Sequence, residues 1–402
     1  MTLAGRVSIL PCGSDAALMV LILLLVVLFA GYAALEYARH LRHLRRIPIR
    51  VQVNGTRGKS SVTRLIAAGL RASGMNVVAK TTGTAPMFIL GDDEEHPVRR
   101  LGKPNIAEQM RMVRLASSRG AGAMVFENMS LDPQYQRVES SMLVRPTDYV
   151  VTNVRSDHLD VMGPTVRDVG RTFRSAIPKR ARMFTAEYRL GDTLAGRARE
   201  EVVADAASVR DEEMHGFNHV EHRENVALAL AVCERAGVRR DVALSGMKRA
   251  KPDPGALRVH VLRESGRELE LVNALAANDP DSIAMIWDLV KDRDREKLVL
   301  VNCRTDRQDR SRQMAELVAN FAADRYVATG GTTRVFLARM RALKVPSDRL
   351  LDLGENRAPD EVFERVLALA ERPTLLFCCG NTVGYGSGLV DRFVERGGGR
   401  GS

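Results

Sequence analysis

The fold is decided by one stretch, Val53-Asn54-Gly55-Thr56-Arg57-Gly58-Lys59-Ser60-Ser61, in which an apolar run enters a turn with two glycines and then a helix. Glycine permits backbone angles that turn successive N–H groups toward a polyphosphate. In such a loop Lys59 adds a positive charge near the β and γ phosphates, and Ser60 offers a hydroxyl to Mg²⁺. Apolar residues then recur at helical spacing, at Val62, Leu65, Ile66 and Leu70. The N-terminal amides of this helix would point at the same anion.

The loop does not meet the general phosphate-loop pattern, because Asn54 and Val53 stand where its first glycine is required. The shorter form G-T-x-G-K-[ST] does fit, with Arg57 at its variable position. A surface turn that only caps a helix is the alternative, but the strand-turn-helix context of a real site favours phosphate binding. We expect the nucleotide to be bound by Asn54, Gly55, Thr56, Arg57, Gly58, Lys59, Ser60 and Ser61.

The composition indicates a folded, basic protein. The chain has 402 residues, of which 45% are hydrophobic, and this is enough for two domains with their own cores. The net charge of +11 predicts an anionic partner. Aromatic residues make up only 5% of the chain and form no stacking run, so we expect no specific nucleic-acid binding. The cysteines show no metal-ligand spacing and are expected to be reduced core residues: Cys12, Cys233, Cys303, Cys378 and Cys379.

A membrane anchor is predicted over residues 16–34, which carry no charge and are about as long as a bilayer-spanning helix. A cleaved signal peptide is the alternative, but the apolar core is long and the charge lies on its C-terminal side. Basic residues follow the span, at Arg39, Arg42, Arg45, Arg46 and Arg50. Because positive residues stay in the cytoplasm, we expect a single-pass cell-membrane protein with cytoplasmic domains.

The rest of the chain predicts an α/β fold. Apolar strands alternate with helical patterns from residue 47 to residue 252, which indicates a mainly parallel sheet, here a P-loop ATPase domain behind the anchor and connector at 1–46. The pattern stops at a proline-containing hinge near Lys251 to Gly255. Residues 253–402 repeat the alternation and predict a smaller, Rossmann-like α/β domain.

Two further strand ends carry candidate metal ligands. Glu127 closes the buried run from Ala123 and would reach the sheet edge at which open α/β sheets bind ligands. It could hold Mg²⁺ or merely cap the next turn. His158 stands between Asp157 and Asp160 after another apolar run, so a neutral imidazole there could bind a second divalent ion.

Seven segments in order resemble those of the ligase subunits of poly-γ-glutamate synthases of the CapB type, within the Mur ligase and folylpolyglutamate synthase superfamily. They are NGTRGKSS, KTTGT, GKPNIAEQ, FENM, TNVRSDHLDVMG, ENVALALAV and VNALAANDPDS. The loop alone is weakly specific, but seven segments behind one N-terminal apolar helix are strongly specific. No domain for a uridine diphosphate handle precedes the loop, which argues against a peptidoglycan-precursor role.

The resemblance implies a set of site residues and cofactors. ATP phosphates would lie on Lys59 and the loop, with Mg²⁺, or alternatively Mn²⁺, on Ser60 and Glu127. His158 resembles the ligand of a second ion. The catalytic residues would be Lys59, Glu127 and His158, and Asn225 would lie near adenine. In the smaller domain the resemblance implicates Asn278, Asp279, Arg304, Asp306 and Arg307.

The resemblance also implies ATP-dependent amide formation between glutamates, with a poly-γ-glutamate chain as acceptor and product. A single span cannot export a polymer, so we expect additional membrane subunits, and a homo-oligomer. Two alternatives remain open: a membrane-tethered ATPase or kinase, and a nucleotide-binding assembly subunit without turnover of its own.

Overall fold

The computed structural model describes residues 12–82, 86–91, 94–100, 102, 104–217, 221–252, 259–275, 277, 280–381 and 385–396. The chain divides into two compact units. The first comprises Met1–Glu213 with Arg223–Ala250, and the second comprises Met214–His222 with Lys251–Ser402. The hinge predicted from the sequence lies partly outside the described residues, and the three-part division at residues 46 and 252 stays a prediction.

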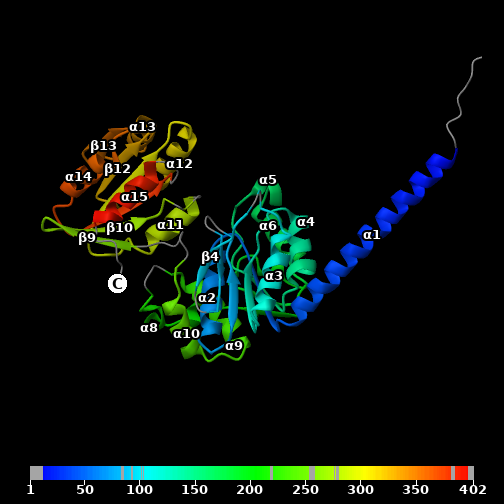
Figure 1. Ribbon diagram of the computed structural model, residues 1–402. Coiled ribbons are helices and arrows are strands. Elements are labelled where there is room, and N and C mark those ends of the chain that lie inside the picture. The colour runs from blue at the N-terminus through cyan, green and yellow to red at the C-terminus, as the bar shows by residue number, and fades with distance from the viewer. Residues whose placement is uncertain are drawn as a thin grey trace, which may run out of the picture. The chain divides into compact units, whose positions relative to one another are not determined.

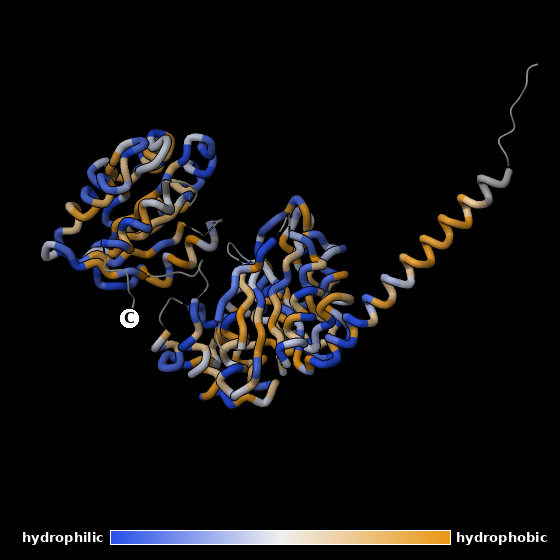
Figure 2. Tube along the Cα trace, viewed as in Figure 1, coloured by the Kyte–Doolittle hydropathy of each residue, from blue (hydrophilic) through white to orange (hydrophobic). Residues whose placement is uncertain are grey.

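The chain begins with a long helix, α1 (Cys12–Arg45), whose middle part Figure 2 shows as mainly hydrophobic and whose end next to the sheet is largely hydrophilic. Its segment from Leu18 to Phe29 is exposed throughout, and the helix is long and apolar enough to cross a membrane. The last turns differ, because His40 and Leu44 are buried against the first unit. The apolar segment of the helix is therefore exposed, while its last turns pack on the rest of the first unit through His40 and Leu44 and leave their arginines exposed.

The first unit is built on an eight-stranded sheet with the order β4-β3-β2-β5-β1-β6-β7-β8 (Figure 1). Its strands are β1 (Ile49–Asn54), β2 (Val77–Lys80), β3 (Met87–Ile89), β4 (Glu95–Pro97), β5 (Ala123–Glu127), β6 (Asp148–Val151), β7 (Arg182–Thr185) and β8 (Glu200–Val203). Strand β1 lies between β5 and β6 and is parallel to both. The strand that leads into the loop is therefore at the centre of the sheet.

The helices of this unit follow the strands. They are α2 (Lys59–Arg71), α3 (Glu108–Ser118), α4 (Pro133–Val138), the π-helix η1 (Glu139–Val144), α5 (Leu159–Met162), α6 (Val166–Ala176), α7 (Gly191–Leu194), the 3₁₀ turn η2 (Ala206–Ser208), α8 (Asp211–Met214), α9 (Arg223–Arg235) and α10 (Arg240–Arg249). Helices α2, α9 and α10 pack on one another, while α3 packs with η1 and with α1.

The second unit holds a six-stranded sheet with the order β13-β12-β11-β14-β10-β9. Its elements are β9 (Val259–Glu264), β10 (Arg267–Asn273), α11 (Pro280–Asp288), β11 (Glu296–Cys303), α12 (Gln308–Val318), β12 (Arg325–Gly330), α13 (Arg334–Ala342), η3 (Ser347–Arg349), β13 (Leu350–Glu355), α14 (Pro359–Leu369), β14 (Thr374–Gly380) and α15 (Tyr385–Arg396). Neighbouring residues of β14 enter two different core clusters, so both faces of the sheet are covered.

The predicted α/β architecture is confirmed, with one correction: neither sheet is wholly parallel. The β3–β4 hairpin is antiparallel, and so is β9 against β10. The short β3 and β4 carry too few residues for a period to be recognised in the sequence. The four cysteines Cys233, Cys303, Cys378 and Cys379 are free and buried, as predicted. Burial raises the pKa of the Cys303 and Cys379 thiols to about 12, so these thiols remain protonated near neutral pH.

Two glycines allow the close packing of α2 against its neighbours. A Cβ at Gly246 of α10 would lie 2.4 Å from the carbonyl oxygen of Ala68 and 2.7 Å from the Cβ of Ala72. A Cβ at Gly69 of α2 would lie 2.7 Å from the sulfur of Cys233. The helix that carries the loop is thus held by backbone-to-backbone contact that a larger residue would separate.

We expect Gly246→Ala to lower the free energy of unfolding of the first unit by about 1–3 kcal/mol, because the added methyl overpacks the contact between α10 and α2. Alanine otherwise stabilises a helix relative to glycine by about 1 kcal/mol. Gly388→Ala in α15, whose Cβ would meet its nearest atom at an ordinary 3.7 Å, is the matched control and should stabilise. Calorimetry should therefore show a lower free energy of unfolding for Gly246→Ala and a higher one for Gly388→Ala. Equal stabilisation of both variants would contradict the packing argument.

Candidate active site

The loop lies at the carboxyl end of the central strand, between β1 and α2, and two glycines shape it. Gly55 has φ 128° and Gly58 has φ 77°, both in the region that favours glycine. A Cβ at Gly55 would lie 2.1 Å from Oγ1 of Thr152 and 2.8 Å from its backbone nitrogen. Only a residue without a side chain can approach β6 this closely, so Gly55 sets the entry to the loop.

Hydrogen bonds from the segment after β6 fix the loop. The N–H of Thr56 donates to the carbonyl of Asn153 (3.0 Å), and the N–H of Arg57 donates to Oδ1 of the same residue (3.1 Å). The hydroxyl of Thr152 donates to the carbonyl of Arg57 (2.6 Å). The guanidinium of Arg57 lies 3.6 Å from the carboxylate of Asp157. The loop is therefore fixed before any ligand binds.

The next backbone N–H groups are left for a ligand. Within the part of the chain that the structure describes, no group accepts a hydrogen bond from the N–H of Gly58, Lys59 or Ser60. These donors open α2, a helix of 13 residues with no acidic residue in its first turn. Consecutive free amides at a helix N-terminus form a site for an anion such as phosphate. The predicted phosphate cradle is thus compatible with the observed backbone.

The Lys59 side chain curls over the loop. Its Nζ donates to the carbonyl oxygens of Gly55 (2.9 Å) and Thr56 (3.2 Å). Burial lowers the pKa of the Lys59 ammonium, while the carboxylates of Glu127 and Asp157 oppose this shift. The Lys59 ammonium is thus partly desolvated and donates to two carbonyl oxygens. An incoming polyphosphate would stabilise this cation, because the phosphate charge would replace the lost hydration.

Glu127 reaches the loop from the end of the neighbouring strand β5. Its Oε2 accepts a hydrogen bond from the hydroxyl of Ser60 (2.8 Å) and another from the backbone N–H of Thr82 (2.8 Å). The Glu127 residue is only 2% exposed. A buried carboxylate beside a serine hydroxyl suits Mg²⁺, which usually takes one or two protein oxygens and completes its shell with phosphate and water. The two residues predicted for the first ion therefore lie together.

His158 is the residue predicted to hold a second ion. It has φ 45°, is about half exposed, and its Nε2 lies 3.8 Å from a carboxylate oxygen of Asp157. Within the described residues, no group of three or more His, Cys, Asp or Glu side chains could hold a metal. Its role as ligand of a second ion stays a prediction.

The two predicted asparagines occupy different positions. The Nδ2 of Asn54 donates to Gln136 (2.9 Å) and to the Tyr149 hydroxyl (2.8 Å), while its Oδ1 accepts from the N–H of Gly55 (2.8 Å). Asn54 therefore supports the loop from beneath. Asn225 on α9 lies against the loop itself, since a Cβ at Gly58 would come within 2.9 Å of its Oδ1.

The remaining predicted residues belong to the second unit. Arg304 follows β11 and pairs with Asp306 through two bonds (3.0 and 2.7 Å), and Arg307 precedes α12. A pocket of about 360 Å³ opens at the carboxyl ends of β11 and β12, lined by Arg304, Thr305, Asp306, Gly330 and Asn356 among others. Asn278 and Asp279 lie outside the described residues.

The last predicted residue, Ser61, belongs to the first unit, where it continues α2 after Ser60.

Sequence reasoning missed the residues that support the loop and the end of β5. Glu139 in the π-helix is fully buried and accepts from Gln109 (2.7 Å), Ser130 (2.7 Å) and the N–H of Met129 (3.1 Å). Burial raises the pKa of this carboxyl. The sequence carries one signal for this buried polar group: polar residues recur within the helical segment, at Gln134, Gln136 and Glu139.

Comparison with known proteins agrees with this geometry. Residues 259–396 match the poly-gamma-glutamate synthase CapB C-terminal domain, and residues 53–175 match the Mur ligase middle domain. PGA synthase CapB of Bacillus subtilis (strain 168) is 34% identical over 359 residues, which cover 87% of this chain and 91% of that protein. The chain belongs to the CapB family of poly-γ-glutamate synthases.

Solved structures show the same fold at low identity. FolC of Escherichia coli in complex with ADP has a TM-score of 0.62 at 15% identity, covering 90% of this chain and 92% of that one. The folylpolyglutamate synthase/dihydrofolate synthase of Yersinia pestis, complexed with AMPPNP and a Mn ion, has a TM-score of 0.60 at 16% identity, covering 90% and 91%. The predicted family, fold class and enzyme class are confirmed: this is an ATP-dependent amide ligase of the Mur ligase superfamily.

We expect Gly55→Ala to weaken ATP binding at least about tenfold, because the methyl would collide with Thr152 and alanine is strained at this φ. Titration of the purified chain with a fluorescent ATP analogue measures the change. Gly191→Ala, where a Cβ would meet nothing within 4 Å, is the control. Wild-type affinity in Gly55→Ala would show that the loop is not the nucleotide site.

Proposed function

We propose that this ligase couples ATP cleavage to γ-amide formation between glutamates. A γ-carboxylate of the acceptor chain attacks the γ-phosphorus of ATP and ADP leaves. The amine of the incoming glutamate then attacks the resulting acyl phosphate, and inorganic phosphate leaves as the amine loses its proton. The observation that carries the proposal is the contact between Ser60 and the buried Glu127 carboxylate, beside loop amides for which no acceptor is found among the described residues.

In this proposal the loop supplies binding and charge. The amides of Gly58, Lys59 and Ser60 would hold the phosphate oxygens, and the Lys59 ammonium would neutralise charge that grows as ADP departs. Phosphoryl transfer needs mainly positioning and electrostatic stabilisation. The attacking carboxylate is already ionised near neutral pH and needs no base. The absence of an activated thiol among the described residues agrees with this chemistry.

Ser60 and Glu127 would hold Mg²⁺, or Mn²⁺ in its place. The cation would supply positive charge beside the phosphates of the nucleotide. The hydrogen bond between the Ser60 hydroxyl and the Glu127 carboxylate supports this assignment, because it brings the two oxygen ligands together.

The other assigned residues are part of the same proposal. We assign adenine contact to Asn225, a second divalent ion to His158, and charge at the incoming substrate to Arg304 and Arg307. Thr56, Arg57 and Ser61 would complete the phosphate contacts. Asn54 would act through Gly55 as a positioning residue, because its own polar atoms are already engaged.

The substrate and the setting complete the proposal. The relative in Bacillus subtilis is named a PGA synthase, and glutamate with a poly-γ-glutamate acceptor is the substrate class we assign. Helix α1 would anchor the chain in the cell membrane by a single pass, with the catalytic units in the cytoplasm. Membrane subunits that export the polymer, and further copies of this chain, would be its partners.

Glutamate-dependent ADP release tests the proposal directly. The full chain, purified in detergent micelles, should form ADP when glutamate and a short γ-glutamate acceptor are present and should release amide product in equal amount. ADP release that ignores glutamate would indicate an ATPase. Phosphate transfer without amide product would indicate a kinase.

We expect Lys59→Ala to lower the rate of ADP release about a hundredfold, because it removes a charge partner contributing on the order of 3 kcal/mol in the transition state. Lys179→Ala, at an exposed position after α6, is the matched control and should keep the wild-type rate. Undiminished turnover in Lys59→Ala, measured by coupled ADP detection, would remove Lys59 from the mechanism.

We expect Glu127→Gln to raise the Mg²⁺ concentration needed for half-maximal rate about tenfold or more, since a neutral amide is a poorer ligand for a hard cation. Glu212→Gln, at an exposed position of α8, controls for the loss of one charge. The measurement is the rate as a function of free Mg²⁺ at saturating ATP. An unchanged Mg²⁺ dependence would make Glu127 a structural residue that positions Ser60.

A further inference from the structure

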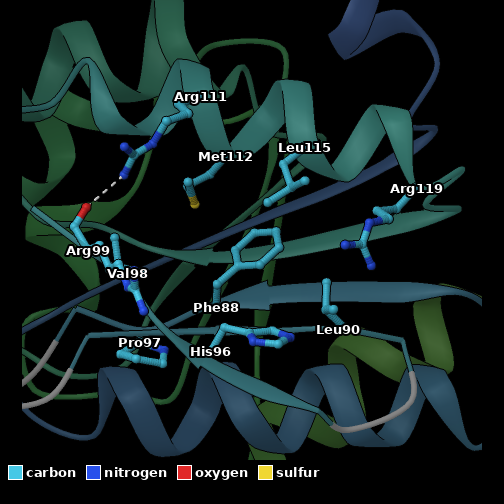
Figure 3. A pocket seen from close by; sticks show the side chains of 10 residues that line it. All are labelled: Phe88, Leu90, His96, Pro97, Val98, Arg99, Arg111, Met112, Leu115 and Arg119. Atoms are coloured by element: carbon cyan, nitrogen blue, oxygen red, sulfur yellow. Dashed lines mark hydrogen bonds between the residues drawn. The ribbon is translucent and has the colours of Figure 1, made fainter.

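A pocket of about 290 Å³ lies between the β3–β4 hairpin and helix α3 (Figure 3), and none of its lining residues belongs to the phosphate loop. Apolar side chains converge on its floor from both elements: Phe88, Leu90, Val98, Met112 and Leu115. Four of these are buried and Leu115 is partly buried. The volume is near the lower limit of small-molecule sites, so the pocket suits one part of a larger ligand.

The rim of the pocket is basic. Arg99, Arg111 and Arg119 line it and are exposed. Arg111 donates to the carbonyl of Arg99 (3.2 Å), and among the described residues none of the three guanidinium groups pairs with a carboxylate. Glu94 of the hairpin lies 3.2 Å from the ring of His96, which also lines the pocket. The three arginines of the rim therefore carry positive charge that no ion pair within the described part of the chain neutralises.

The pocket lies close to the point at which α1 would leave a membrane. On another side of α3, Arg114 lies 3.7 Å from Glu36 of α1, and Ser117 bonds to the ring of His43 (3.2 Å). Leu44 of α1 shares an apolar cluster with the pocket residues Phe88 and Met112. Glu36 directly follows Leu35, the last of the exposed large apolar residues of α1, so α3 is held within about one helical turn of the end of the span.

We propose that this pocket binds an anionic phospholipid of the membrane that α1 crosses. The phosphate of the headgroup would meet the arginine rim, and the glycerol and upper acyl carbons would cover the apolar floor. The proposal depends on membrane insertion of α1 and not on the ligase reaction. Exposed basic residues near the end of the span add to the attraction for an anionic leaflet: Arg39, Arg42, Arg45 and Arg46.

The combination of floor and rim selects this ligand over other anions. Each residue of a γ-glutamate chain carries a carboxylate and only two methylene groups, so the chain could meet the rim but would bury little apolar surface on the floor. An uncharged lipid could cover the floor and would leave the arginines without an anion, and a zwitterionic lipid would bring a cation to the same rim together with its phosphate. An anionic phospholipid satisfies both parts without that cation.

Photo-crosslinking in nanodiscs tests the proposal. The full chain is inserted into nanodiscs of phosphatidylcholine and phosphatidylglycerol that contain a photoactivatable phosphatidylglycerol, and labelled peptides are mapped by mass spectrometry. We expect labels on the β3–β4 hairpin and α3. The triple variant Arg99→Gln, Arg111→Gln, Arg119→Gln should reduce them about fivefold or more, since one arginine near an anionic surface already contributes about that factor. Leu115→Trp, which fills the floor without changing charge, should reduce them too.

The control removes the same charge elsewhere in the first unit. Arg137→Gln, Arg167→Gln and Arg180→Gln change exposed residues on α4, on α6 and in the turn after α6. This variant should keep the labelling, and calorimetry should show the same thermal transition in all variants.

Equal labelling of the rim and control variants overturns the proposal, as does equal labelling by a photoactivatable phosphatidylcholine. If soluble poly-γ-glutamate prevents labelling of the hairpin and α3, the pocket is a product site and the proposal is wrong. If only a membrane subunit prevents this labelling, the pocket binds a protein partner and the proposal is also wrong.

Discussion

The active site depends on the contact between Gly55 and the end of β6. With 2.1 Å between an imagined Cβ and the Thr152 hydroxyl, no side chain fits, and the loop can take its hydrogen bonds from Thr152 and Asn153 only because of this closeness. These bonds satisfy the first amides of the loop and orient the next ones outward. The phosphate cradle is therefore built by the neighbouring strand as much as by the loop itself.

A buried polar layer supports this arrangement from below. Asn54, Gln136 and Tyr149 are joined by hydrogen bonds, and burial raises the pKa of the Tyr149 phenol, which therefore stays neutral. Unpaired polar groups inside a protein cost about 1–3 kcal/mol each, so such a layer is stable only when its bonds are made together. It fixes the end of β1 in one position, and preorganisation of the loop follows from that.

Much of this could be predicted from the sequence, and the limits have physical reasons. Local patterns predict the loop, the end of β5 at Glu127 and the alternation of strands and helices. These features are predictable because glycine spacing and apolar runs depend only on residues that are close in the sequence. The role of Thr152 in holding the loop could not be predicted, since it depends on which strand lies beside β1. The metal-ligand role of His158 rests on its local setting between two acids and stays a prediction; the structure shows the side chain half exposed, with Nε2 3.8 Å from a carboxylate oxygen of Asp157.

Helix α3 contacts two regions of the first unit, α1 and β2. Its first residue, Glu108, is buried and pairs with Lys80 of β2 (2.8 Å) and with Arg100 (2.7 Å). Burial lowers the pKa of Lys80, and the Glu108 carboxylate opposes this shift. Removing one member of a buried pair leaves an uncompensated charge and costs about 3–5 kcal/mol, so the start of α3 is firmly held to β2.

Two residues beyond Lys80, the N–H of Thr82 donates to Glu127, while the other end of α3 packs on α1. The strand that carries Lys80 leads to the N–H that donates to Glu127, so α1, α3 and the Glu127 carboxylate are linked by contacts within one unit.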